Sequence, residues 1–218
     1  MGRSDPNKSI KATGDSPCLF AEISAPAPYL YRWMIREMKK YTSKPIDRFA
    51  FRFKNYTYRP IRLCLEDGQG LAATILLCCA IDLLAKFSSG NPKNSGNRVK
   101  YVDFLKRYFP SAYNPDTFYE FVRCGLVHSY SMEDQYTILC RDEPWACQVH
   151  LCKDTKTGKM VINPFKILAD LQAAVRSYVE DVKTSEVKGE AFLRVHKAIP
   201  LRQQVSRWKK LKYLAVDT

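Results

Sequence analysis

The segment from Gly70 to Ser88 constrains the fold of this chain more than any other part of the sequence. It is apolar on nearly every side of a helix, and Asp82 is its one acidic residue. The apolar run is short for a transmembrane span, and Asp82 and Lys86 interrupt it. A helix that is apolar all round must then be surrounded by protein. The sequence therefore predicts a buried helix at the centre of a mainly α-helical domain.

Apolar periodicity and start signals place further helices around this one. A helix is expected from about Val99 to Tyr108. The next has the clearest start signal, because Asn114 can cap it, Pro115 suits the first helical position and Asp116 complements the helix dipole. A third opens at Asn163-Pro164. The positions expected to face the core are Tyr101, Val102, Leu105 and Phe109 in the first, Phe118, Phe121, Val122, Gly125 and Leu126 in the second, and Ile167, Leu168, Leu171, Ala174, Val175 and Tyr178 in the third.

Gly125 is unusual inside the second of these helices, which we expect to continue to Tyr130. Glycine in a helix costs about 1 kcal/mol relative to alanine. A close approach of another backbone at this point would explain why a glycine is there.

Two segments are predicted to be extended. From Phe49 to Arg59 aromatic residues alternate with other residues, which predicts extended chain with a turn at Asn55. The interleaved basic residues suggest a base-stacking surface, and aromatics that cover a helical core are the favoured alternative. Farther on, Cys147–Leu151 and Met160–Ile162 flank a polar turn at residues 153–159, which predicts a small β-hairpin before the last core helix.

The chain divides into three parts on this interpretation. Residues 1–27 form a flexible N-terminal arm, residues 28–182 form the helical domain, and residues 183–218 form a basic C-terminal extension. Within the helical domain, a first helix is expected to begin at Pro28. The extension carries an amphipathic helix whose apolar positions are Leu201, Val205, Trp208, Leu211 and Ala215.

Basic residues are concentrated at the two ends of the chain. The 35 Lys and Arg residues exceed the 22 Asp and Glu residues, giving a net charge of +13. Residues 1–64 carry +8 and residues 183–218 carry +6, whereas the middle of the chain is close to neutral. Such a field attracts polyanions, so RNA is the expected partner. An anionic membrane surface, an acidic protein and a surface that only keeps the protein in solution are the alternatives. The candidate nucleic-acid-binding residues are Arg52, Lys54, Arg59, Arg202, Arg207, Lys209, Lys210 and Lys212.

The cysteines and the N-terminus indicate a cytoplasmic protein. The eight cysteines show no disulfide framework, and Cys78 and Cys79 are adjacent in the apolar helix. The first residues contain no apolar signal core. Reduced thiols are therefore expected. Cys147 and Cys152 would point to opposite faces of a predicted strand, which argues against a zinc site between them. No cofactor is predicted.

Arg123 and His128 are the candidate catalytic pair. Metal-independent RNA cleavage needs a base for the 2′-hydroxyl proton, an acid for the leaving 5′-oxygen and a cation for the charged phosphorane. A histidine suits the first two roles and an arginine the third. Five residues span about 140° of an ideal helix, so a helix end near Gly125 or a second protomer is needed for the two side chains to meet. The lower-ranked supporting residues are Asp82, Glu120, Ser129 and Tyr130.

The region from residue 65 to 182 resembles the HEPN (higher eukaryotes and prokaryotes nucleotide-binding) superfamily. The resemblance rests on the apolar helix, the polar loop that follows it, the helix before Pro110, and the segment Arg123-Cys124-Gly125-Leu126-Val127-His128. The trailing hairpin and helix are similar to those of small HEPN-like bacterial proteins. The resemblance implies a HEPN-like bundle and a metal-independent ribonuclease. It also implies that a homodimer supplies Arg123 and His128 twice to one cleft.

Three interpretations of the chain stay open at this point. One is an endoribonuclease of toxin or RNA-defence type, with an antitoxin-like partner. Another is a non-catalytic HEPN-like binding or scaffolding module, since Cys124 stands where that superfamily usually has a polar residue. The third is an unrelated helical protein, in which Arg123 and His128 only compensate a helix dipole. For Asp82 and Glu120, a solvated position on a helix surface is the favoured alternative.

Overall fold

The structure of the protein is a computed structural model that describes residues 44–132 and 135–199. The expected N-terminal arm, the helix from Pro28 and the amphipathic helix at residues 201–215 lie outside these residues. The described chain is mainly α-helical, as predicted. Its elements are α2 (Pro45–Phe53), the π-helix η1 (Lys54–Tyr58), α3 (Arg59–Glu66), α4 (Gly70–Ser89), α5 (Asn97–Tyr108), α6 (Pro115–Thr117), the π-helix η2 (Phe118–Cys124), α7 (Gly125–Ser129), β1 (Tyr136–Ile138), α8 (Pro144–Gln148), β2 (Met160–Ile162), α9 (Pro164–Thr184) and α10 (Glu186–Ala198).

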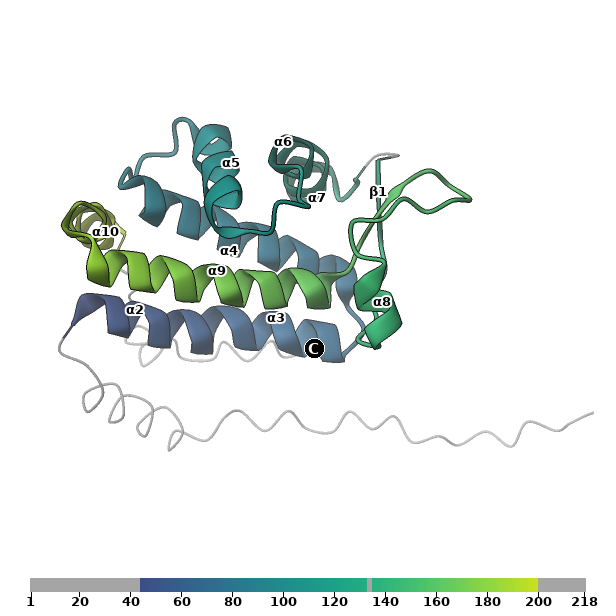
Figure 1. Cartoon of the computed structure of the whole chain (residues 1–218), viewed down its shortest axis with the longest axis horizontal. Coiled ribbons are helices and arrows are strands. Elements are labelled where there is room, and N and C mark those ends of the chain that lie inside the picture. Colours follow the sequence, from purple (N-terminus) through teal and green to yellow (C-terminus); the bar gives the residue numbers. More distant parts are fainter. Residues whose placement is uncertain (1–43, 133–134, 200–218) are drawn as a thin grey trace, which may run out of the picture. The chain divides into compact units, whose positions relative to one another are not determined.

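Helix α4 lies at the centre of the bundle. Figure 1 shows α4 and α9 between a row formed by α2 and α3 and a second row formed by α5, α6 and α7. Leu77, Ile81 and Leu84 are fully buried in this core. In the described part of the chain, α4 is the one helix long and apolar enough to cross a bilayer by length and composition, and more than half of it is buried in the fold.

The expectation that protein surrounds α4 on every side is wrong for one strip of the helix. Leu71 is 42% exposed and Leu76 is 37% exposed, and Cys79 is also exposed. The main neighbours of α4 are α3, α5, α9 and α10. An apolar strip therefore faces away from the core beside Asp82.

The segment from Phe49 to Arg59 is helical, so the predicted extended chain is wrong. Pro45 occupies the first turn of α2, and the chain then continues through η1 into α3. Phe49 and Phe53, four residues apart, are 0% and 1% exposed, and their rings lie 5.7 Å apart. When aromatics occupy every second position, some of them are four residues apart. Residues four apart share a face in a helix as well as in a strand, so the alternation fits both. The alternative, in which aromatics cover a helical core, is confirmed.

The predicted hairpin is only partly present. Met160–Ile162 forms β2, but its partner is β1, which runs parallel to it in the register Tyr136 to Met160. Cys147 lies in α8, because Pro144 starts a helix there. The chain does reverse at the predicted turn. Leu151 donates to the carbonyl of Val161 at 2.7 Å, and a single antiparallel bridge joins Lys153 to Met160.

Helices α9 and α10 complete the core. Asn163 caps α9 by accepting a hydrogen bond from the Phe165 amide, and the six apolar positions expected on this helix are buried. Residue 182, where we expected the domain to end, lies inside α9. Helix α10 then packs on α4 and α9 with Phe192 and Val195 buried, so the described core continues beyond the expected boundary.

A buried polar network ties the chain before α6 to the segment between α8 and α9. The Tyr113 hydroxyl donates to Asp170 at 2.9 Å and lies 2.9 Å from His150 Nε2. His150 Nδ1 accepts a hydrogen bond from the Asn163 amide at 2.9 Å, so the ring is neutral with its proton on Nε2. Burial lowers the pKa of His150 to about 4. Lys166 pairs with Asp170 and balances its charge.

Candidate active site

The helical segment that carries Arg123 starts as predicted but is not one α-helix. The side chain of Asn114 caps α6 by accepting from the Thr117 amide at 3.2 Å. The π-helix η2 follows immediately and gives way to α7 at Gly125. Inserted π turns are rare and occur frequently at functional sites. This one places Arg123 in its last turn, just before α7 presents His128.

Arg123 is anchored to α4 by an ion pair with Asp82. Its Nε and Nη2 atoms each lie 2.8 Å from Oδ2 of Asp82, and the two side chains are only 14% and 19% exposed. The guanidinium also lies over the ring of Tyr119, with Cζ 5.5 Å from the ring centre. Burial alone would lower the pKa of Arg123, but the hydrogen bonds and charge of Asp82 outweigh it and raise this pKa. The arginine is therefore held as a fixed cation.

The remaining nitrogen of Arg123 reaches His128 within the same chain. Its Nη1 atom lies 3.2 Å from His128 Nε2. Because a guanidinium can only donate, Nε2 is the acceptor and the histidine proton is on Nδ1. His128 is exposed. The two side chains therefore meet without a second protomer, at the change from π to α geometry near Gly125.

Gly125 is where another backbone approaches, as predicted. A Cβ atom at this position would lie 2.1 Å from the carbonyl oxygen of Ser131. The Ser131 amide in turn donates to the Gly125 carbonyl at 3.2 Å. The glycine therefore lets the chain after α7 fold back closely beside the Arg123–His128 pair.

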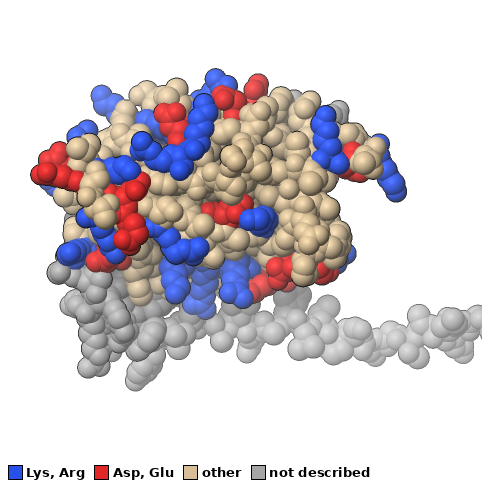
Figure 2. Space-filling model, viewed as in Figure 1, with Lys and Arg blue, Asp and Glu red and all other residues tan. Residues whose placement is uncertain are grey.

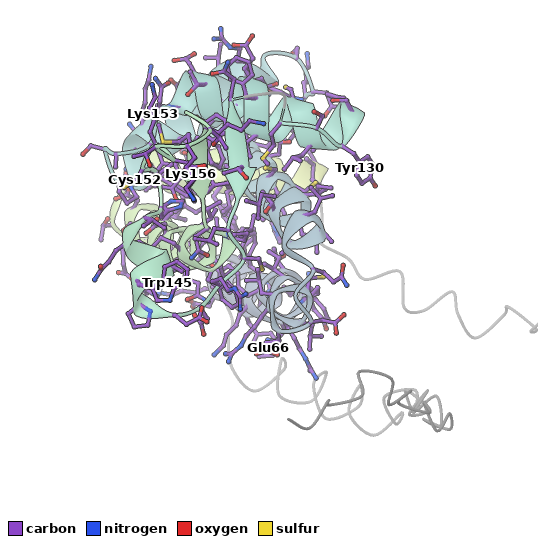
Figure 3. The ribbon with its side chains drawn as sticks, turned by 90° about the vertical axis from the view of Figure 1, so that its right-hand side faces the viewer. Glu66, Tyr130, Trp145, Cys152, Lys153 and Lys156 are labelled. Atoms are coloured by element: carbon purple, nitrogen blue, oxygen red, sulfur yellow. The ribbon has the colours of Figure 1, made fainter. Side chains whose placement is uncertain are left out.

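Two of the supporting residues follow His128 directly. Ser129 donates its hydroxyl to the Gly125 carbonyl at 2.8 Å, so its proton is used within α7. Tyr130 ends the helix in the left-handed region, with φ of 54°, and is 72% exposed. Figure 3 shows its side chain projecting away from the helices. It is available to a ligand bound beside His128.

The two acidic candidates differ in what they contact. Asp82 is the partner of Arg123, so it is not a solvated surface residue. Glu120 is exposed, and within the described residues no hydrogen bond or ion pair links it to Arg123 or His128. Tyr119 was not among the predicted site residues, although its position four residues before Arg123 on a helix was a usable signal.

The predicted nucleic-acid-binding residues are not brought to this site. Arg52, Lys54 and Arg59 lie on α2, η1 and α3, across α4 and α9 from α7 (Figure 1). Figure 2 shows Lys and Arg side chains gathered along that edge of the molecule. The other five predicted residues, Arg202, Arg207, Lys209, Lys210 and Lys212, lie outside the described chain.

Two further findings bear on what the site is. Among the described residues, no group of three His, Cys, Asp or Glu side chains is placed to hold a metal ion. Comparison with the models of known protein families, with curated proteins and with solved structures finds no match for this chain. Its function must therefore be argued from the geometry itself.

Proposed function

We propose that the protein is a metal-independent endoribonuclease of the HEPN-like type, in which Arg123 and His128 act on the RNA. The observation that carries this proposal is the 3.2 Å contact between Arg123 Nη1 and His128 Nε2 at an exposed position, with the arginine fixed by Asp82. It joins a neutral histidine to a permanent cation, which are the two groups that metal-free cleavage of RNA requires.

Each side chain has a defined role in this reaction. Once the substrate 2′-hydroxyl displaces the Arg123 N–H from His128 Nε2, this nitrogen takes the hydroxyl proton, and the resulting oxygen attacks the adjacent phosphorus. Arg123 Nη1 stabilises the charge that develops on the phosphorane. The 5′-oxygen leaves with a proton from a protonated histidine, and a 2′,3′-cyclic phosphate remains on the other fragment. Asp82 is a positioning residue, because it holds the guanidinium and does not touch the substrate.

A homodimer supplies the second histidine. One protomer presents one His128, whereas the reaction uses a base and an acid at the same time. The exposed apolar strip on α4, with Leu71, Leu76 and Cys79, lies on the same helix as Asp82. Exposed apolar side chains gathered on one helix suit a contact surface. Pairing two copies through it places two Arg123–His128 pairs near one another.

RNA cleavage in the presence of EDTA tests this function. We expect the native chain to leave cyclic-phosphate ends, and His128→Ala and Arg123→Ala to lose cleavage by at least a hundredfold. Arg98→Ala is the matched control, since Arg98 also pairs with an aspartate, Asp116, at 2.7 Å but on the exposed surface. An intact substrate with the native chain, or full cleavage by His128→Ala, would refute the proposal.

A non-catalytic RNA-binding module is the second candidate. The observation that favours it is that Asp82 engages two of the three guanidinium nitrogens and balances the charge of Arg123. This candidate predicts intact RNA, with binding that weakens steeply as salt rises.

A toxin would instead arrest growth when expressed in the cytoplasm. His128→Ala or an antitoxin-like partner would relieve that arrest. Anionic vesicles test the alternative of membrane-surface attachment through residues 201–215.

A further inference from the structure

A cleft of about 610 Å³ lies between α4 and α5, where the loop joins the two helices. Its volume is in the range of small-ligand sites. One wall is apolar and contains Ala85, Val99 and Phe104. The charged residues of the lining are Lys100, Lys106, Arg107 and Asp103, so the cleft carries a positive balance. Figure 2 shows basic side chains in front of α5, on the face turned to the viewer.

Most lysines near this cleft have no ion pair among the described residues. Lys86, Lys93 and Lys100 lie in a stretch, residues 83–102, that contains no Asp or Glu, whereas Arg98 of the same stretch pairs with Asp116 at 2.7 Å. Among the described residues, Lys86 donates to the neutral amide oxygen of Asn94, at 2.8 Å. Lys100 donates to the carbonyls of Lys93 and Asn91, at 2.6 and 3.3 Å. An ammonium has three protons, so one proton of Lys100 is left for another acceptor.

The positive charges of Lys86 and Lys100 also repel each other. Lys100 is only 8% exposed, and burial, together with the charge of Lys86, lowers its pKa. Two uncompensated cations that converge on one loop repel each other. A bound anion would remove this repulsion, and Lys106 and Arg107 extend from α5 into the same cleft without an ion pair in the described structure.

We propose that the α4–α5 cleft binds a phosphate group of a nucleotide unit, with Lys100, Lys106 and Arg107 as its donors. The apolar wall, in which Val99 is exposed, then accommodates the base or sugar. The unit belongs either to an RNA strand or to a free nucleotide, which offer the same chemistry. The cleft shares no residue with the Arg123–His128 pair, so binding in the cleft can be tested independently of the proposed cleavage.

Binding to the full chain is measured with inorganic phosphate, AMP and a short single-stranded RNA, at constant ionic strength. The test variants are the double substitution Lys106→Gln with Arg107→Gln, and Lys100→Met, which keeps the packed stem. The double substitution Lys153→Gln with Lys156→Gln is the matched control, because it removes two charges from an exposed turn that does not line the cleft. We expect each test variant to lose at least tenfold in affinity and the control to lose less than threefold.

The three probes separate the two sources of phosphate. Tight binding of AMP that the test variants weaken identifies a free nucleotide, whereas binding of RNA alone identifies a strand. Equal affinity of the native chain and both test variants for all three probes would overturn the proposal. The lysines would then serve only to bind the carbonyls of the loop after α4 and to compensate the dipole of α4.

Discussion

Alanine at Gly125 and at Gly189 should have opposite effects on stability, although both glycines lie in helices. In an open helix the change to alanine gains about 1 kcal/mol. At Gly189 the new Cβ would meet the Val182 carbonyl oxygen at 3.4 Å, which is an ordinary contact. The gain should therefore be kept there, and the melting temperature should rise by about 2–4 °C.

At Gly125 the same methyl group has no room. It would lie 2.1 Å from the Ser131 carbonyl oxygen, so the backbone after α7 must move and the amide bond from Ser131 back to Gly125 is strained. Overpacking of this kind costs about 1–3 kcal/mol. After the gain of about 1 kcal/mol in helix propensity, we expect a net loss of about 1 kcal/mol, which lowers the melting temperature by about 2–4 °C.

Thermal unfolding followed by circular dichroism compares the two variants with the native chain. A Gly125→Ala protein that melts at or above the native temperature would refute the reasoning, because the Ser131 backbone would then have to yield freely. A loss of similar size in Gly189→Ala would show instead that helix glycines matter here for another reason. In the proposed ribonuclease, Gly125→Ala should also reduce cleavage, since Arg123 and His128 flank the displaced backbone.

Three other predictions follow from contacts in the structure. Burial lowers the pKa of His150 from 6.5 to about 4, so between these pH values only the unfolded chain takes up the proton. Up to about 3 kcal/mol of unfolding free energy should therefore be lost as the pH falls from 6.5 towards 4. Urea unfolding of His150→Gln should show a smaller loss over the same pH range. Tyr130→Gly should raise stability by about 1 kcal/mol in chemical unfolding, because Tyr130 is held at a positive φ; a destabilised variant would contradict this. Asp82→Asn should cost about 2 kcal/mol by leaving Arg123 unbalanced, whereas Asp116→Asn in the exposed pair should cost less than about 1 kcal/mol, so equal losses would contradict the argument.

The long helices were predictable because their signals are local. Asn114 and Asn163 cap the helices that they precede, and the apolar positions of α5 and α9 are buried as their spacing predicts. The segment at Phe49 was not predictable by period alone, since positions 49 and 53 share a face in a helix and in a strand. The parallel pairing of β1 with β2 joins residues 24 apart and has no local signal.

The candidate site was predictable only in part, for a similar reason. Arg123 and His128 are five residues apart, so a motif identifies both. The partner of Arg123 is Asp82, 41 residues earlier, and their contact depends on how η2 packs on α4. The π geometry of η2 also has no marker in the sequence. For this reason Asp82 was only a lower-ranked candidate from the sequence, and a second protomer was one expected way of bringing Arg123 and His128 together.

The turn between α8 and β2 gives this protein a place that tolerates insertion. Asp154 accepts hydrogen bonds from the Lys156 amide and the Thr157 hydroxyl, and its own amide donates to Lys159, so the turn is held mainly by bonds within itself. Its tip is exposed (Figure 3). Insertions are accepted best at such tips. A peptide epitope or dye placed after Lys156 would tether or label the protein while leaving the exposed strip of α4 and the α4–α5 cleft uncovered.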